Sequence, residues 1–202
     1  MLKRFKCCEV PCPEKLYNEY EALGDNMLNA NADVDKVEAI LLDFVELHKD
    51  EPIYFFLELP PEYRSELQVS SGQNIIGEDN DTYYIDNITP AKARELLALY
   101  GEILINDGIS RFGFGGNFSN DHLVVDKYNV LNLFAQEIEP VQAIFEKHGL
   151  VRTDSLVTAW DTFTEEEPGV CTRYVKEDVD VFALPALLGS WGIYLLNIRP
   201  DE

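Results

Sequence analysis

The order of its elements is the feature that most constrains this fold, because helical segments are repeatedly followed by a turn and then by a strand. Apolar residues at three- and four-residue spacing predict helices at 34–48, 90–105 and 140–148, and a short helical turn at 181–188. Strand-like segments follow one another between the helices, whereas a doubly wound parallel fold would alternate more strictly. The sequence therefore predicts an α+β fold with a mixed or largely antiparallel sheet packed against three main helices. The expected strands lie at 53–59, 82–86, 109–118, 123–125, 128–134 and 191–198.

Two further segments are rich in residues that favour turns. The acidic turn at 165–169 is expected to join strands at 156–163 and 170–175 into a β-hairpin. The stretch at 70–81 is rich in Ser, Gly, Asn and Asp, which predicts a mobile loop or a hairpin tip.

The chain is expected to form one domain over residues 1–202, because no linker rich in Pro, Ser or Gly divides it. The N-terminal segment at 1–13 is expected to be loosely attached to this domain. The basic first residues lead into Glu9 and Pro11 rather than into an apolar stretch, so they do not read as a signal peptide. No apolar run reaches the length of a membrane span, and a cytoplasmic location is the expectation.

The charge limits the kind of partner. There are 37 Asp and Glu against 16 Lys and Arg, a net charge of −21. Nucleic acids and anionic membranes are recognised by clustered Lys and Arg, so both are excluded as expected partners. A charge of this sign favours a basic protein partner, or simply high solubility.

The four cysteines do not predict a cofactor. Cys7, Cys8 and Cys12 lie near the start of the chain and Cys171 lies far from them, without the paired C-x-x-C spacing of zinc sites. Reduced structural thiols are the expectation, and zinc bound by the four thiolates is the alternative. The acidic run at 78–81 lacks the continuing oxygen ligands of a calcium loop, because Tyr83 and Tyr84 follow it.

The histidines and glycines do not predict a catalytic residue. His48 and His148 fall in the last turn of expected helices, where a cation offsets the helix dipole. A Ser119–His122 pair matches no triad spacing. Gly113, Gly115 and Gly116 have no following Lys, so they indicate a bulge or a close approach between backbones rather than phosphate binding.

Two candidate binding regions remain. Acidic clusters at 78–86 and 161–180 are interleaved with aromatic residues, a combination suited to docking a cationic protein. The candidate residues of this interaction surface are Asp79, Asp81, Tyr83, Trp160, Glu165, Glu166 and Glu167. The alternative is a small-molecule pocket built around Phe112, Phe114, Asn117 and His122, on a strand with Phe112 and Phe114 on one face.

The sequence therefore favours a non-enzymatic interaction module that binds a basic partner. Its size and acidity are similar in style to the small, acidic α+β immunity proteins that bacteria use against their own secreted toxins, a likeness of size and charge without a shared motif. The alternatives are a small-molecule-binding protein or hydrolase with the pocket at 112–122, and a domain that acts only within a larger assembly.

Overall fold

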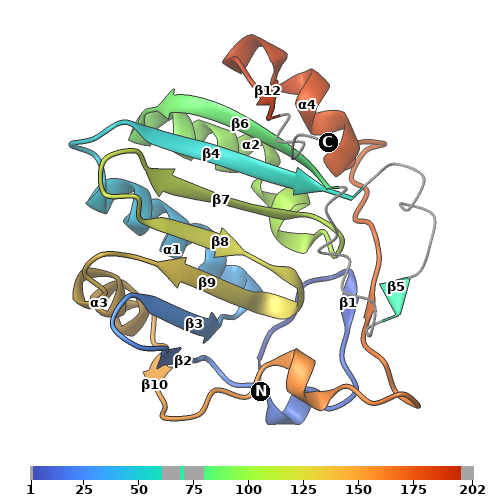
Figure 1. Ribbon diagram of the computed structural model, residues 1–202. Coiled ribbons are helices and arrows are strands. Elements are labelled where there is room, and N and C mark those ends of the chain that lie inside the picture. The colour runs from blue at the N-terminus through green and yellow to red at the C-terminus, as the bar shows by residue number, and fades with distance from the viewer. Residues whose placement is uncertain (1, 61–68, 71–79, 197–202) are drawn as a thin grey trace, which may run out of the picture.

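A central nine-stranded sheet, mostly antiparallel, organises the structure (Figure 1). The computed structural model describes residues 2–60, 69–70 and 80–196. The strand order is β10-β2-β3-β9-β8-β7-β4-β6-β12, and the parallel pair is β10 with β2. The strands of this sheet are β2 (Glu19–Ala22), β3 (Met27–Asn31), β4 (Ile53–Leu59), β6 (Asp81–Ile88), β7 (Arg111–Gly116), β8 (His122–Val125), β9 (Val130–Phe134), β10 (Val151–Arg152) and β12 (Tyr194–Leu195).

The three main helices all lie on one side of this sheet (Figure 1). They are α1 (Val34–Leu47), α2 (Pro90–Asn106) and α3 (Glu139–Lys147), which confirms the helices expected from the apolar spacing. Thr89 caps α2 by accepting a hydrogen bond from the backbone N of Lys92, and Pro90 fits the first turn because its missing N–H has no partner there. Shorter helical turns are η1 (Pro13–Lys15), η3 (Lys127–Asn129), η4 (Ala159–Thr162), η5 (Val181–Ala183), α4 (Leu184–Leu187) and η6 (Gly189–Trp191).

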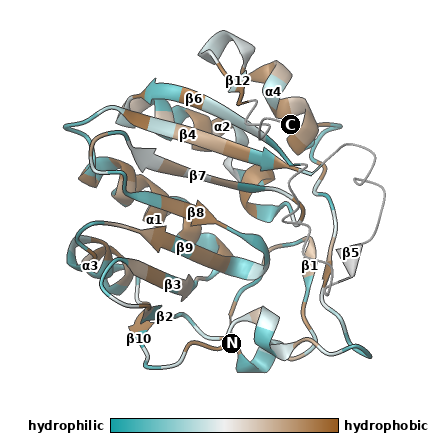
Figure 2. Cartoon of the chain, viewed as in Figure 1, coloured by the Kyte–Doolittle hydropathy of each residue, from teal (hydrophilic) through white to brown (hydrophobic). Residues whose placement is uncertain are grey.

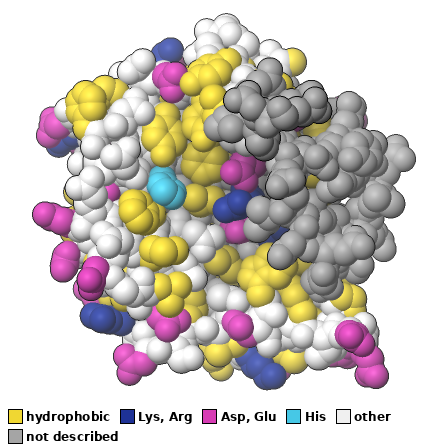
Figure 3. Space-filling view, viewed as in Figure 1, with side chains coloured by type: hydrophobic (Ala, Val, Ile, Leu, Met, Phe, Trp, Pro, Cys, Tyr) yellow, Lys and Arg dark blue, Asp and Glu magenta, His cyan; other side chains and the backbone are white. Residues whose placement is uncertain are grey.

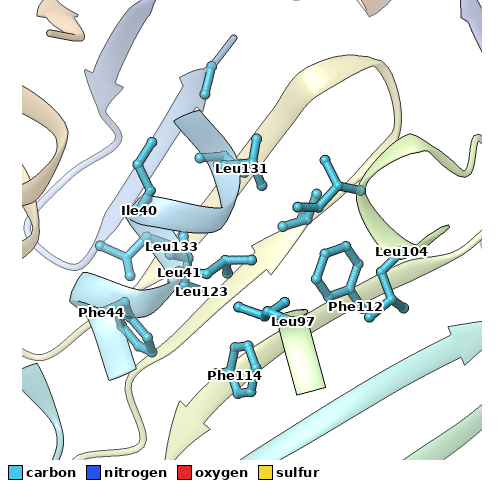
Figure 4. Packing of buried hydrophobic residues seen from close by; sticks show 14 of the residues in the cluster. Ile40, Leu41, Phe44, Leu97, Leu104, Phe112, Phe114, Leu123, Leu131 and Leu133 are labelled. Atoms are coloured by element: carbon cyan, nitrogen blue, oxygen red, sulfur yellow. The ribbon is translucent and has the colours of Figure 1, made fainter. Parts of the chain in front are cut away.

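The core fills the space between the sheet and these helices. Alternate residues of each strand point toward the helices, since successive side chains of a strand lie on opposite faces. Figure 2 shows hydrophobic residues gathered on the central strands and on α1. In Figure 4, Phe112 and Phe114 of β7 lie beside Leu97 of α2, with Phe44 of α1 near Phe114. All four side chains are buried.

A small three-stranded sheet joins distant parts of the chain. It consists of β1 (Cys8–Glu9), β11 (Val170–Cys171) and β5 (Val69–Ser70), in the order β1-β11-β5 with antiparallel pairing. The N-terminal segment is therefore packed and not loosely attached. Leu2 and Phe5 are each 3% exposed, and the backbone N of Phe5 donates to Oδ1 of Asn129 at 2.9 Å.

The expected hairpin at 156–163 and 170–175 is wrong. Its first half contains η4, which begins with a capping box between Thr158 and Asp161, and its second half pairs with β1 and β5 instead. The last strand is shorter than expected, since β12 contains two residues and follows η6. The loop expected at 70–81 lies outside the described residues at positions 71–79, and β6 begins at Asp81.

A helix must be both long and apolar to cross a membrane. Within residues 2–60, 69–70 and 80–196, every helix is too short or too polar to cross a bilayer.

Candidate functional site: the open face of the central sheet

The side of the central sheet opposite α1, α2 and α3 carries a row of aromatic side chains. We call this surface the open face and define it by Tyr54, Phe56, Tyr84, Tyr194, His122 and Phe134. Among the described elements, none lies in front of the central strands in Figure 1. Figure 3 shows hydrophobic side chains and a histidine gathered on this side. Tyr194 and Phe134 are 42% and 36% exposed, Tyr54, Tyr84 and His122 are half-buried, and Phe56 is buried beneath its neighbours. Apolar side chains that reach the surface together can mark a site of interaction.

Strand register brings these rings together from distant parts of the sequence. Tyr84 lies directly opposite Tyr194 on one side and Phe56 on the other, with ring centroids 6.3 Å apart in both pairs. Tyr54 is 5.8 Å from Tyr84. Cross-strand aromatic pairs at these separations stabilise a sheet and hold each ring in place. The four rings therefore form a continuous cluster across β12, β6 and β4.

A second pair of rings continues the surface across β8 and β9. His122 lies opposite Phe134, and the rings are nearly parallel, with centroids 5.5 Å apart at an angle of 20°. Phe134 is 36% exposed although it is large and apolar. His122 thus belongs to an aromatic surface and not to an acid–base pair with Ser119.

Glycines of β7 separate the two ring clusters. Gly115 lies opposite Tyr54 and Gly113 opposite Phe56, and the rings from β4 lie against the β7 backbone. A Cβ atom on Gly115 would be 2.3 Å from the Tyr54 ring, and one on Gly113 would be 2.8 Å from Cε1 of Phe56. At Gly115 the close approach is between the Tyr54 ring and the β7 backbone. A Cβ atom on Gly113 would also be 2.1 Å from the carbonyl oxygen of Leu123, so the close approach between backbones expected from the sequence is present there.

Replacing Gly115 with alanine is expected to lower the free energy of unfolding by about 1–3 kcal/mol, because the added methyl group overlaps the Tyr54 ring. Truncating that ring with Tyr54→Ala should remove most of this additional cost. Urea denaturation of both single variants and the double variant measures the coupling. Simple additivity of the two changes would contradict this packing. Gly189→Ala is the control, since nothing lies within 4 Å of its added Cβ.

Next to the open face lie the cation Arg111 and the carboxylates of Glu58, Asp126 and Asp86. Nη1 of Arg111 is 3.0 Å from Oε2 of Glu58, and its Nε is 3.3 Å from Oδ2 of Asp126. Asp86 accepts a hydrogen bond of 2.8 Å from the hydroxyl of Tyr194. Two carboxylates therefore pair with the single charge of Arg111. Together with Asp86, these four side chains carry a net negative charge.

The tyrosine hydroxyls of the open face remain protonated at neutral pH. Burial, followed by the charge of Glu58, raises the pKa of Tyr84. The hydrogen bond to Asp86 raises the pKa of Tyr194, and burial raises that of Tyr54. These phenols are therefore neutral hydrogen-bond donors, and their apolar rings present a π surface suited to cations.

Phe112 and Phe114 do not line a pocket with His122, which corrects that expectation. Phe112 and Phe114 are 1% and 0% exposed. In Figure 4 they lie beside Leu97 of α2, on the helix side of β7. His122 lies opposite Gly115, so its side chain belongs to the other face. Asn117 follows β7 in an exposed turn, where its backbone N donates to the carbonyl of Pro52 at 2.9 Å. The alternation along β7 places the two phenylalanines together, but in the core.

A shallow hollow of about 280 Å³ lies near this turn, lined by His48, Asp121 and Ser119 among others. Nε2 of His48 is 3.0 Å from Oδ2 of Asp121, and its Nδ1 is 2.9 Å from the carbonyl of Phe44. Both ring nitrogens therefore lie within hydrogen-bond distance of an oxygen atom. Oγ of Ser119 accepts from the backbone N of Asp121 at 3.2 Å. These side chains link the end of α1 to the β7–β8 turn.

The structure separates most of the candidate interaction residues, although Phe182, just beyond Asp180, lines a small hollow together with Asp81 and Tyr83. Asp81 is exposed at the start of β6, with Tyr83 two residues further on, and Asp79 lies outside the described residues. Trp160 lies in η4, which appears in orange at the opposite end of the molecule from β6 in Figure 1. It packs edge-on against Tyr128 with centroids 4.8 Å apart. The chain beyond η4 contains three exposed carboxylates, those of Glu165, Glu166 and Glu167.

Four members of the open face were not expected from the sequence: Tyr54, Phe56, Phe134 and Tyr194. The available signal was the period of two in a strand, which places Tyr54, Phe56 and Glu58 on one face of 53–59. That these residues would meet Tyr84 and Tyr194 depends on strand order.

Metal ligands do not gather in the part of the chain that the structure describes, where no group of three or more His, Cys, Asp or Glu side chains could hold an ion. Comparison of the chain with protein-family models, with curated proteins and with solved structures gives no match.

Proposed function

We propose that this protein is a non-enzymatic interaction module that binds a basic protein through the open face of its central sheet. The observation that carries this proposal is a fixed row of aromatic rings on a sheet face left uncovered by the described helices. Aromatic side chains held rigid by their neighbours lose little entropy on binding, and they are enriched among residues that dominate interface energies. An inhibitor or an immunity-like protein that covers its partner's surface is one role of this class.

Charge favours a basic protein as the occupant. The chain has a net charge of −21, and the cation next to the open face, Arg111, is already paired with Glu58 and Asp126. Lys and Arg side chains of a partner would stack on the tyrosine rings and pair with carboxylates such as Asp86. A second copy of this chain is disfavoured because it would bring another 21 excess negative charges to the interface.

A pair of matched variants tests the proposal. The face variant combines Asp86→Lys with Phe134→Lys, and the helix control combines Glu95→Lys with Leu99→Lys. Both sets change the net charge by the same amount. Leu99 is 56% exposed on α2, on the side of the sheet away from the open face. Far-ultraviolet circular dichroism and melting curves check that both variants remain folded.

The expected result is capture of a basic protein from native lysate by the wild-type chain and by the helix control, with loss of capture in the face variant. Capture should also weaken as salt rises to ~0.5 M, because screening shortens the reach of the carboxylates. Equal loss in both variants, or retention by the face variant, would contradict the proposal. A dimer in sedimentation that the face variant converts to monomer would identify a second copy as the occupant instead.

A further inference from the structure

Two cysteines far apart in sequence face each other across the small three-stranded sheet. In the antiparallel pair of β1 and β11, Cys8 lies directly opposite Cys171, and their Sγ atoms are 3.0 Å apart. Both are free thiols, separated by 163 positions along the chain. Pairing of distant strands, not chance proximity of flexible side chains, creates this contact.

The hydrogen-bond pattern identifies the kind of cross-strand pair. The backbone N of Thr172 donates to the carbonyl of Cys7 at 2.8 Å, so that neighbouring pair is hydrogen-bonded. Narrow and wide pairs alternate along an antiparallel ladder, which makes Cys8 and Cys171 a non-hydrogen-bonded pair. Cα atoms in such pairs are about 4.5 Å apart, within the range that disulfides span. A bond between these sulfurs therefore requires little backbone movement.

Surrounding contacts hold the two strands in this register. The backbone N of Gly108 donates to the carbonyl of Thr172 at 3.0 Å. A Cβ on Gly108 would be 2.6 Å from the carbonyl oxygen of Cys7, so α2 leads directly into this sheet at close range. Cys8 and Cys171 are 5% and 1% exposed, which shields the pair from other thiols.

The other cysteines are placed differently. Side chains of adjacent strand residues lie on opposite faces, so Cys7 points away from the pair. Its Sγ contacts the carbonyl of Arg173 at 3.5 Å. Cys12 lies beyond β1, at the residue before η1. The geometry selects Cys8 and Cys171 from the four thiols.

We propose that Cys8 and Cys171 are a modification site at which a reversible disulfide forms in the presence of a small-molecule disulfide oxidant. With oxidised glutathione, the Cys8 thiolate attacks a glutathione sulfur, forming a mixed disulfide and releasing one reduced glutathione. The Cys171 thiolate then attacks Sγ of Cys8 and releases the second. Two protein thiols are oxidised, and one glutathione disulfide is reduced to two thiols.

Formation of this disulfide is slow and its product is stable. The contact with Cys171 and burial hold the pKa of Cys8 well above its usual range, so the reactive thiolate is scarce until the strands open locally. Once formed, the bond closes a very long loop, which restricts the unfolded chain strongly. It fixes the N-terminal segment to β11 covalently.

The test equilibrates the protein with glutathione buffers of increasing oxidised fraction until the thiol content is constant. A Cys7→Ser, Cys12→Ser double variant retains the pair, and Cys171→Ser removes it. The wild-type chain and the double variant are expected to lose the mass of two hydrogen atoms, to yield a peptide linking Cys8 to Cys171, and to melt about 5–10 °C higher than when reduced. Cys171→Ser should show no such increase in melting temperature.

Free thiols that persist at Cys8 and Cys171 in the most oxidising buffer would overturn the proposal. So would a disulfide that links Cys7 to Cys12, or a Cys8–Cys171 bond that lowers the melting temperature. Because the double variant keeps both proposed residues, the test stands even if Cys171→Ser fails to fold. This proposal does not depend on the open face, and its outcome leaves the proposed function unaffected.

Discussion

Phe114→Ala is expected to lower the free energy of unfolding by about 3–5 kcal/mol, the usual cost of truncating a buried phenylalanine. Phe114 is fully buried, and its ring centroid is 5.4 Å from that of Phe55 on the neighbouring strand. Phe114 lies between β7 and the helices (Figure 4). A densely packed interior collapses only partly around the cavity that truncation leaves. Urea denaturation monitored by circular dichroism measures the change.

Phe118→Ala is the matched control for this prediction. Its side chain is 74% exposed, four residues further along the same segment, and its truncation should change the free energy of unfolding by less than about 0.5 kcal/mol. A pocket role for Phe114 would give a different pattern, with a small loss of stability and a loss of ligand binding. A stability loss below about 1 kcal/mol would contradict the core position.

Asp107→Ala is expected to lower the free energy of unfolding by about 3 kcal/mol or more, because several buried donors lose their acceptor. Oδ2 accepts from the backbone N of Ile109 and from both the N and Oγ of Ser110, and Oδ1 accepts from the N of Tyr174, all within 3.0 Å. Burial raises the pKa of Asp107, while these four donors favour its ionised form. The carboxylate ties the end of α2 to β7 and to the chain beyond β11.

Two comparisons make this prediction specific. Asp107→Asn keeps the shape but places an amide donor among donors, so it should also destabilise, by less than the alanine variant. Asp25→Ala removes an exposed turn carboxylate and should change the free energy of unfolding by less than about 0.5 kcal/mol. Thermal and urea unfolding of the three variants measure the differences. Equal stability of Asp107→Ala and Asp25→Ala would show that the four hydrogen bonds contribute nothing net.

Elements defined by local pattern could be predicted from this sequence. The apolar faces of α1, α2 and α3 repeat at helical spacing, and Thr89 and Pro90 provide a start signal that the structure uses. Strands β4, β7, β8 and β9 were likewise expected. The α+β class follows from the order of these elements, since several strands follow one another without a helix between them.

The pairing of strands that lie far apart in the sequence could not be predicted. Val170 and Cys171 look like half of a hairpin, but their partners are residues 8–9 and 69–70, and no local pattern encodes that choice. The open face likewise results from strand pairing that no local pattern of the sequence encodes. Alternation places Phe112 and Phe114 on one face of a strand, yet which face the helices cover depends on packing. Strand order then decides that Phe56 lies between Tyr84 and Gly113.

The two edge strands of the central sheet bear on how this protein avoids aggregation. Its outermost strands, β10 and β12, are two residues long, and each covers part of a longer neighbour. Unpaired strand edges are templates on which another chain can add as a further strand, the usual beginning of edge-to-edge aggregation. Such short outer strands offer few backbone groups for that growth. The rims of the sheet therefore resist fibril-like extension, which leaves its face free for the binding role proposed above.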